Sequence, residues 1–129
     1  LRRSDVVSLH APSLPETRHL LDARRLRLLS DGTILINTAR GALIDQAALI
    51  AELVPGLAAA VLDVTDPDIL PADSPLYDLP NVLLTPHIAG AIGDERHRFG
   101  RLTADEIGRF LRGEALRHAI DPATFQFQA

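Results

Sequence analysis

Several absences narrow the function before any motif is considered. The sequence contains no cysteine, which excludes disulfide bonds and thiolate catalysis. No apolar stretch approaches the ~20 residues of a membrane span, and the opening LRRSDVVSLH lacks the apolar segment of a signal peptide. The net charge is −4 and no run of Lys or Arg exceeds two residues, so nothing favours nucleic acid or an anionic membrane. We therefore expect a cytoplasmic protein whose partner is a small molecule or a second copy of itself.

The apolar segments that are present have the lengths and spacing of an α/β domain. A chain of 129 residues with 47% apolar content can form one globular core, and it contains no internal repeat. Short aliphatic segments bounded by Pro, Gly or Asp predict strands. Helical periodicity and aspartate caps predict the helices between them. The expected strands are Asp5–His10, Thr33–Thr38, Leu57–Val64 and Asn81–His87, and the expected helices are Ala23–Leu29 after Asp22, Gln46–Leu53 after Asp45, and Asp94–Leu111.

Strands without a polar face that alternate with helices indicate a parallel sheet with helices on both faces. We predict a partial Rossmann-type sheet, a fragment of a doubly wound domain. In such sheets the ligand binds outside the carboxyl ends of the strands. Four strand ends carry polar residues and are the candidate site: His10 with its proline loop, Thr38–Gly41, Asp63–Asp68 and His87–Gly90.

An arginine, a histidine and a carboxylate at these strand ends would suit a reaction on a small anionic carbonyl compound. The guanidinium of Arg40 can hold a carboxylate through two hydrogen bonds and polarise a neighbouring carbonyl. His87 can transfer one proton near neutral pH, and a carboxylate bonded to its imidazole would stabilise the charged ring. These parts fit proton transfer coupled to hydride transfer.

Each of these residues also has an ordinary structural interpretation. Arg40 could form an ion pair, His87 could bond to loop backbone, and Asp66 and Asp68, which flank Pro67, could simply form a turn. A metal site is not predicted, because DVTDPD lacks the central Gly and distal Glu of a calcium loop and no His pair has zinc spacing.

Four motifs occur together in the order found in one enzyme family. The chain resembles the D-isomer-specific 2-hydroxyacid dehydrogenases in these four segments: SDVVSLHAPSLPETRHLLD, LINTARGALIDQAAL, LDVTDPDILPADSPLYDLPNVLLTPHIAG and FLRGEALRHAIDP. The resemblance extends from Ser4 to Pro122. It implies an oxidoreductase that interconverts a 2-oxo acid and a D-2-hydroxy acid with NAD or NADP.

The resemblance also implies a role for individual positions. Arg40 matches the arginine that binds the substrate carboxylate, and His87 matches the acid/base histidine. Asp63 matches the aspartate that contacts the nicotinamide carboxamide. The loop from His10 to Glu16 resembles the one that passes over the pyrophosphate and ribose. The implied catalytic residues are Arg40, Asp68 and His87, and the implied cofactor-binding residues are His10, Pro12, Thr38, Ala39, Arg40, Asp63, His87 and Gly90.

The sequence departs from the family at the carboxylate that pairs with the histidine. Most members have Glu at the position of Asp68, whose side chain is shorter by one C–C bond, roughly 1.5 Å. An increase of this size in the distance between the carboxylate and the imidazole would break a hydrogen bond unless the loop shifts. Our hypothesis is an Asp68–His87 pair that works but is weakened.

The glycine-rich phosphate loop and almost the whole substrate domain of the family lie N-terminal to SDVVSLH and have no counterpart here. We therefore expect residues 1–129 to be the C-terminal part of an NAD(P)-binding domain from a polypeptide of roughly 300 residues. Residues 113–129 would lead back towards an absent substrate domain. The resemblance further implies a homodimer.

Two other interpretations remain open. One is a non-catalytic protein that senses dinucleotides, since corepressors similar to this family keep the Arg and His motifs. The other is an inactive gene remnant. The substrate and the choice between NAD and NADP depend on residues outside this sequence.

Overall fold

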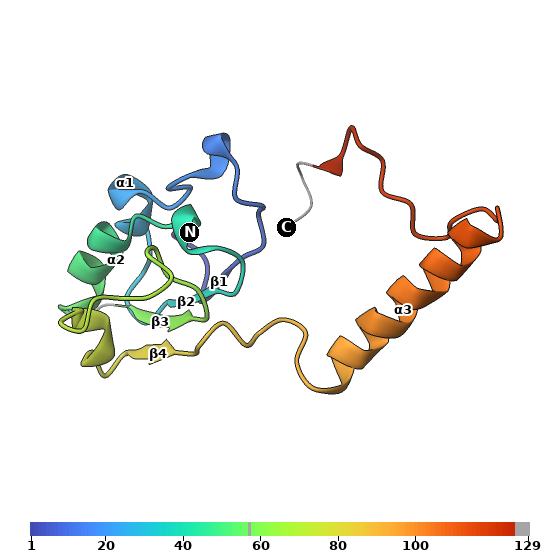
Figure 1. The fold of residues 1–129 in the computed structure, drawn as a ribbon. Coiled ribbons are helices and arrows are strands. Elements are labelled where there is room, and N and C mark those ends of the chain that lie inside the picture. The colour runs from blue at the N-terminus through green and yellow to red at the C-terminus, as the bar shows by residue number, and fades with distance from the viewer. Residues whose placement is uncertain (57, 126–129) are drawn as a thin grey trace. The chain divides into compact units, whose positions relative to one another are not determined.

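The computed structural model describes residues 1–56 and 58–125. The chain forms two compact units, the first comprising Leu1–His87 and the second beginning at Ile88. Figure 1 shows the sheet and two short helices of the first unit and the single long helix of the second. Within the described residues, no helix is both long and apolar enough to cross a bilayer.

The first unit is built on a four-stranded parallel sheet in the order β1-β2-β3-β4. Each strand lies inside a predicted segment, and Leu57, the first residue of the third prediction, lies outside the described residues. The prediction of a parallel, Rossmann-type α/β fold is confirmed. The strands are β1 (Val6–Leu9), β2 (Ile34–Asn37), β3 (Ala59–Leu62) and β4 (Val82–Leu84).

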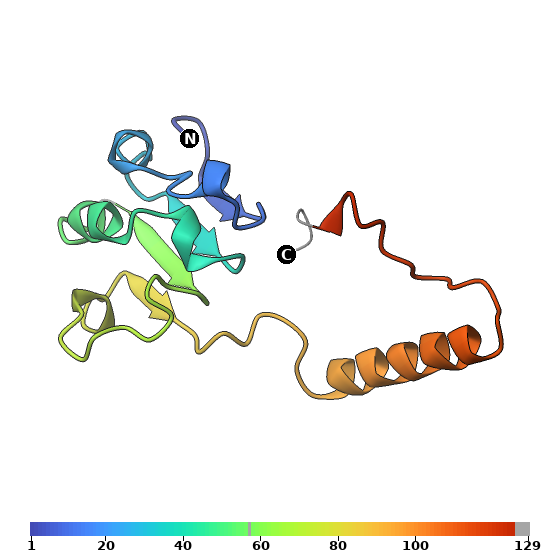
Figure 2. The ribbon, with the colours of Figure 1, turned by 45° about the horizontal axis from the view of Figure 1, so that its top comes forward.

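The two faces of this sheet differ in their surroundings. Strand residues alternate between faces, and the buried ones, such as Leu35, Ala60 and Leu62, all lie on one face. Figures 1 and 2 show α1 (Ala23–Leu26) and α2 (Gln46–Leu53) on the same side of the sheet. The sequence predicted helices on both faces of the sheet. Within the first unit, α1 and α2 cover the same face. On the opposite face Val6, Ile34 and Leu83 are exposed.

Aspartate caps begin both helices, as predicted. The carboxylate of Asp22 accepts a hydrogen bond from the Arg25 N–H at 2.7 Å, and this bond lowers the pKa of Asp22. The cap therefore stabilises α1 at neutral pH and loses its effect as the pH falls through that lowered pKa. We expected α1 to reach Leu29, but the Leu28 and Leu29 amides bond three residues back, so the chain tightens after Leu26.

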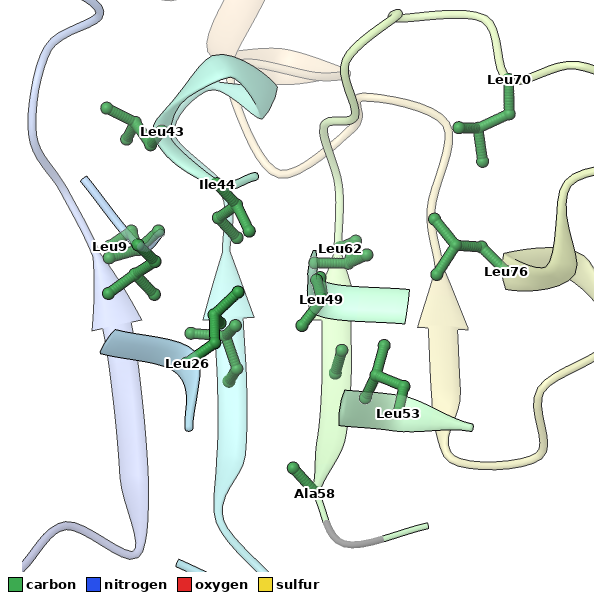
Figure 3. Close-up of a cluster of buried hydrophobic side chains, with 13 residues drawn as sticks. Leu9, Leu26, Leu43, Ile44, Leu49, Leu53, Ala58, Leu62, Leu70 and Leu76 are labelled. Atoms are coloured by element: carbon green, nitrogen blue, oxygen red, sulfur yellow. The ribbon is translucent and has the colours of Figure 1, made fainter. Parts of the chain in front are cut away.

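The core lies between these helices and the covered face of the sheet (Figure 3). Leu49 and Leu53 are four residues apart in α2, so both point from one side of the helix into the core, where neither is more than 2% exposed. Leu70 and Leu76, which belong to the proline-rich loop Thr65–Pro80, extend the core. That loop also contains a 3₁₀ turn at Pro75–Tyr77, which the sequence did not predict.

The second unit contains α3 (Asp94–Leu111), whose bounds match the predicted helix. Gly93, with φ 53°, precedes it. Beyond its C-terminus the carboxylate of Glu114 accepts a hydrogen bond from Arg112 at 2.7 Å, which lowers the pKa of Glu114 and raises that of Arg112. The apolar residues that predicted this helix are exposed within the unit: Phe99, Leu102, Ile107, Phe110 and Leu111.

Candidate functional site at the carboxyl edge of the sheet

The strand register brings several predicted site residues into one row. Beyond the strands, the ladder continues through a bond from the Asp63 N–H to the Asn37 carbonyl and one from the Thr85 N–H to the Leu62 carbonyl, both 3.0 Å. Asp63 therefore follows β3 next to Thr85, which follows β4. Thr38 follows β2 and His10 follows β1 in the same register. At the carboxyl edge of the sheet, where the sequence predicted a site, a polar row is thus formed by His10, Thr38, Asp63 and Thr85.

Asp63 is the most enclosed member of this row. Only 4% of the residue is exposed. The Thr85 hydroxyl donates a hydrogen bond to Asp63 Oδ1 at 2.5 Å. A buried carboxylate of this kind needs hydrogen-bond donors because burial removes its water. Sequence reasoning assigned a role to Asp63 but missed Thr85, which sits in NVLLTPH one residue before a proline.

The turn after β2 carries Arg40, and the buried side-chain amide of Asn37 holds the backbone of this turn. The Asn37 side chain is 1% exposed, and it accepts a bond from the Ala39 N–H at 3.1 Å and donates one to the Arg40 carbonyl at 2.9 Å. Arg40 itself is exposed, with Nη1 donating to the Ala39 carbonyl at 2.7 Å. Asn37 was missed from sequence, although a single amide inside the aliphatic segment TILIN is the signal that could have revealed it.

Gly41 is required by a close approach between two loops. A Cβ built at this position would overlap the carbonyl carbon and oxygen of Thr65 and would lie 2.7 Å from the Asp66 nitrogen. The loop after β3 therefore passes directly against the Arg40 turn, and only glycine leaves room for it.

His87 lies where the chain turns after β4. Its φ is +55°, and its N–H is shared between the Asp63 carbonyl at 3.1 Å and the Thr85 carbonyl at 3.0 Å. The imidazole is exposed. The backbone of His87 is thus attached directly to the two residues that form the Asp63–Thr85 bond.

Asp68 is not in hydrogen-bond contact with His87 among the described residues. It is exposed, and together with Thr85 it lines a hollow of about 290 Å³ between the loop after β3 and the end of β4. The predicted Asp68–His87 pair therefore stays a hypothesis.

The loop after β1 is organised by its own side chains. His10 Nε2 and Ser8 Oγ are 2.8 Å apart. The Thr17 hydroxyl donates to the Pro12 carbonyl at 2.6 Å. Arg18 then forms an ion pair with Asp66 at 3.4 Å. We expected Asp66 only to form a turn, but its carboxylate also joins the loop after β3 to the loop after β1.

Thr38, Ala39 and Gly90 complete the set of predicted site residues. Thr38 is exposed and Ala39 is half-buried in the Arg40 turn. Gly90 belongs to the second unit. In the part of the chain that the structure describes, no group of three or more His, Asp or Glu side chains could hold a metal ion.

Comparison with known proteins identifies the family. Residues 1–89 match the model of the D-isomer specific 2-hydroxyacid dehydrogenase, NAD binding domain. The chain belongs to this family. The resemblance seen in its four motifs is thereby confirmed.

Individual relatives agree with this assignment. A glyoxylate reductase of Thermofilum pendens is 44% identical over 115 residues, which are 88% of this chain and 34% of the relative. The crystal structure of a D-isomer specific 2-hydroxyacid dehydrogenase from Xanthobacter autotrophicus Py2 in complex with NADPH and MES is 40% identical, with a TM-score of 0.80 over 95% of this chain and 50% of that one. Apo D-mandelate dehydrogenase of Rhodotorula graminis is 38% identical, with a TM-score of 0.84 over 93% and 35%.

The chain spans about a third of the length of the curated glyoxylate reductase that it matches. The part that it shares with the family includes β1 to β4 and the whole polar row at their carboxyl ends.

The contact at Gly41 leads to a direct prediction. Gly41→Ala should lower the free energy of unfolding of the chain by about 1–3 kcal/mol, because the added methyl group must displace the backbone of Thr65 and Asp66. Urea denaturation measures this change. Gly100→Ala is the control, since a Cβ there meets nothing within 4 Å and alanine favours a helix. Equal stability of the Gly41→Ala and wild-type chains would contradict the close approach.

Proposed function

We propose that this chain is the nicotinamide-side part of the NAD(P)-binding domain of a D-2-hydroxyacid dehydrogenase, and that the enzyme interconverts a 2-oxo acid and a D-2-hydroxy acid. The observation that carries the proposal is the buried Asp63 carboxylate in the polar row at the carboxyl edge of the sheet, between the turns that present Arg40 and His87. Family membership supports it.

The residues at this edge fit the nicotinamide half of NAD or NADP. A carboxamide offers N–H donors, and Asp63 is a carboxylate enclosed at the strand end where such ligands bind. Thr38, Ala39 and Gly90 are the proposed neighbours of the ring, as the family motifs imply. His10 and Pro12 are the proposed contacts of the ribose and pyrophosphate. When bound, the reduced cofactor supplies the hydride.

Arg40 is proposed to bind the substrate carboxylate. Its guanidinium is exposed, while Asn37 holds the backbone of its turn through two hydrogen bonds. A planar fork of donors on a fixed turn can bind a carboxylate in one orientation. Because the carbonyl carbon of a 2-oxo acid is bonded to its carboxylate, holding the carboxylate in one orientation also limits the positions of the carbonyl group.

His87 is proposed to donate the proton that the carbonyl oxygen needs during reduction. Its exposed imidazole and fixed backbone suit a group that must meet the substrate reproducibly. Asp68 is proposed as the third catalytic residue, which stabilises the charged imidazole once the loop after β3 brings the two side chains together.

We further propose that the chain acts within a longer polypeptide that includes a substrate domain. The segment 113–129 is proposed to continue towards that domain, and its residues 126–129 lie outside the described residues. The longer polypeptide is supported by the relatives, of which this chain covers half or less. By the complete protein we mean the whole polypeptide that carries this sequence in its source organism, and we propose that it is a homodimer in the cytoplasm. An intact mass of about 14 kDa for that polypeptide would contradict the longer chain.

The complete protein should oxidise NADH or NADPH when given glyoxylate or hydroxypyruvate, as measured by the loss of cofactor absorbance. His87→Gln should lower kcat by about 10²–10⁴-fold because it removes the proton donor. Arg40→Lys should raise KM and lower kcat/KM because lysine cannot bind a carboxylate through a planar fork.

Arg24→Lys is the matched control for Arg40→Lys, because Arg24 is exposed on α1 and belongs to no proposed site. Cofactor binding without turnover of any 2-oxo acid would favour the alternative, a protein that only senses dinucleotides.

The Asp68–His87 hypothesis has its own test. Asp68→Glu should move the pH–rate profile of 2-oxo acid reduction towards higher pH, because the longer side chain reaches further towards the imidazole and stabilises its charged form. Asp73→Glu, an exposed aspartate of the same proline-rich loop, is the control. Identical profiles for wild type and Asp68→Glu would count against any coupling between the two residues.

A further inference from the structure

The pair formed by Asp63 and Thr85 follows from the strand register. Leu62 is paired with Leu84 at the ends of β3 and β4. The Thr85 N–H continues the ladder by bonding to the Leu62 carbonyl at 3.0 Å. Asp63 and Thr85, which follow these two leucines, are therefore neighbours. Their side chains lie on the face of the sheet opposite to the leucine side chains. The position of Thr85 beside Asp63 is thus determined by backbone hydrogen bonds and not by loop conformation.

The side-chain bond within this pair is short and enclosed. The Thr85 hydroxyl donates to Asp63 Oδ1 at 2.5 Å, the short end of the range for O–H···O hydrogen bonds. Asp63 is 4% exposed and Thr85 is partly buried, so little water competes for the bond. Threonine is β-branched and has few side-chain rotamers, which makes it a rigid donor.

The same threonine is also attached to the acid/base candidate. Its carbonyl accepts the His87 N–H at 3.0 Å, and that N–H is shared with the Asp63 carbonyl at 3.1 Å. Side chain and main chain of one residue therefore contact both Asp63 and His87. A change at Thr85 can affect the carboxylate while leaving this backbone pattern in place.

We propose that Thr85 is a positioning residue that fixes the rotation of the Asp63 carboxylate for the carboxamide group of the nicotinamide. This inference rests on the proposed function. A carboxylate can turn about its Cβ–Cγ bond, and a rigid donor bonded to one oxygen limits that rotation. The protein then distinguishes cofactors by the substituent on the nicotinamide ring, because only a substituent with an N–H donor gains from a correctly turned carboxylate.

The test compares two cofactors on the complete protein. NADH carries the carboxamide, whereas in the reduced 3-acetylpyridine analogue a methyl group replaces the NH₂. Thr85→Val removes the hydroxyl while keeping the shape of the side chain, and Thr85→Ser keeps the hydroxyl. The dissociation constant of each cofactor is measured by fluorescence titration without substrate, and KM is measured during glyoxylate reduction. The two constants should change in parallel.

We expect Thr85→Val to raise KM for NADH about tenfold, the effect of losing one charge-assisted hydrogen bond. KM for the acetylpyridine analogue should stay the same, and Thr85→Ser should restore the wild-type value for NADH. In an Asp63→Asn background Thr85→Val should have no further effect on the ratio of the two KM values, because the two residues act as one unit.

An equal rise in KM for both cofactors would overturn the proposal, since loss of local structure affects both alike. An unchanged KM for NADH in a folded Thr85→Val protein would also overturn it. Should valine prevent folding, Thr85→Ala gives the same comparison. Failure of the wild-type protein to turn over either NADH or NADPH with any 2-oxo acid would instead overturn the proposed function itself, so the two failures are distinguishable.

Discussion

The parallel backbone ladder between β2, β3 and β4 is the constraint on which the site depends. Two bonds beyond the strands, from the Asp63 and Thr85 amides to carbonyls of the preceding strands, extend the register by one residue. They bring side chains more than twenty residues apart in the sequence into contact at one edge. A shift of the register by one residue would turn Asp63 to the opposite face of the sheet and separate it from Thr85. The chemistry proposed for the chain therefore depends on backbone pairing before it depends on any loop.

A second level of organisation holds the loops against this edge. The buried amide of Asn37 fixes the turn that carries Arg40, and Gly41 lets the loop after β3 pass beside it. The Arg18–Asp66 ion pair then joins that loop to the one after β1. The pair is largely exposed, so it contributes little to stability. It is a contact between the two loops, whereas the core beneath α1 and α2 supplies the stability of the unit.

Local sequence signals predicted most of the fold. Asp45 and the apolar periodicity of QAALIAEL defined both ends of α2, and the charged, periodic segment after Asp94 defined α3. The sequence could not reveal the Asp63–Thr85 bond or the contact at Gly41, because both arise only when separate strand ends are brought together. Arg40, Asp63 and His87 could be proposed as site residues because each follows a strand within a family motif. Asp68 could be proposed in the same way, but a motif does not determine whether a shortened carboxylate reaches an imidazole.

A crystal structure of the complete protein with NADH and oxamate would show directly whether the nicotinamide binds beside Asp63, because oxamate resembles a 2-oxo acid and does not accept a hydride. We predict that Asp63 accepts a hydrogen bond of about 3 Å from the carboxamide nitrogen, that Arg40 binds the oxamate carboxylate, and that the His87 imidazole faces the oxamate carbonyl oxygen. A nicotinamide ring bound away from the carboxyl ends of β2, β3 and β4, with Asp63 making no contact to it, would contradict the proposed site.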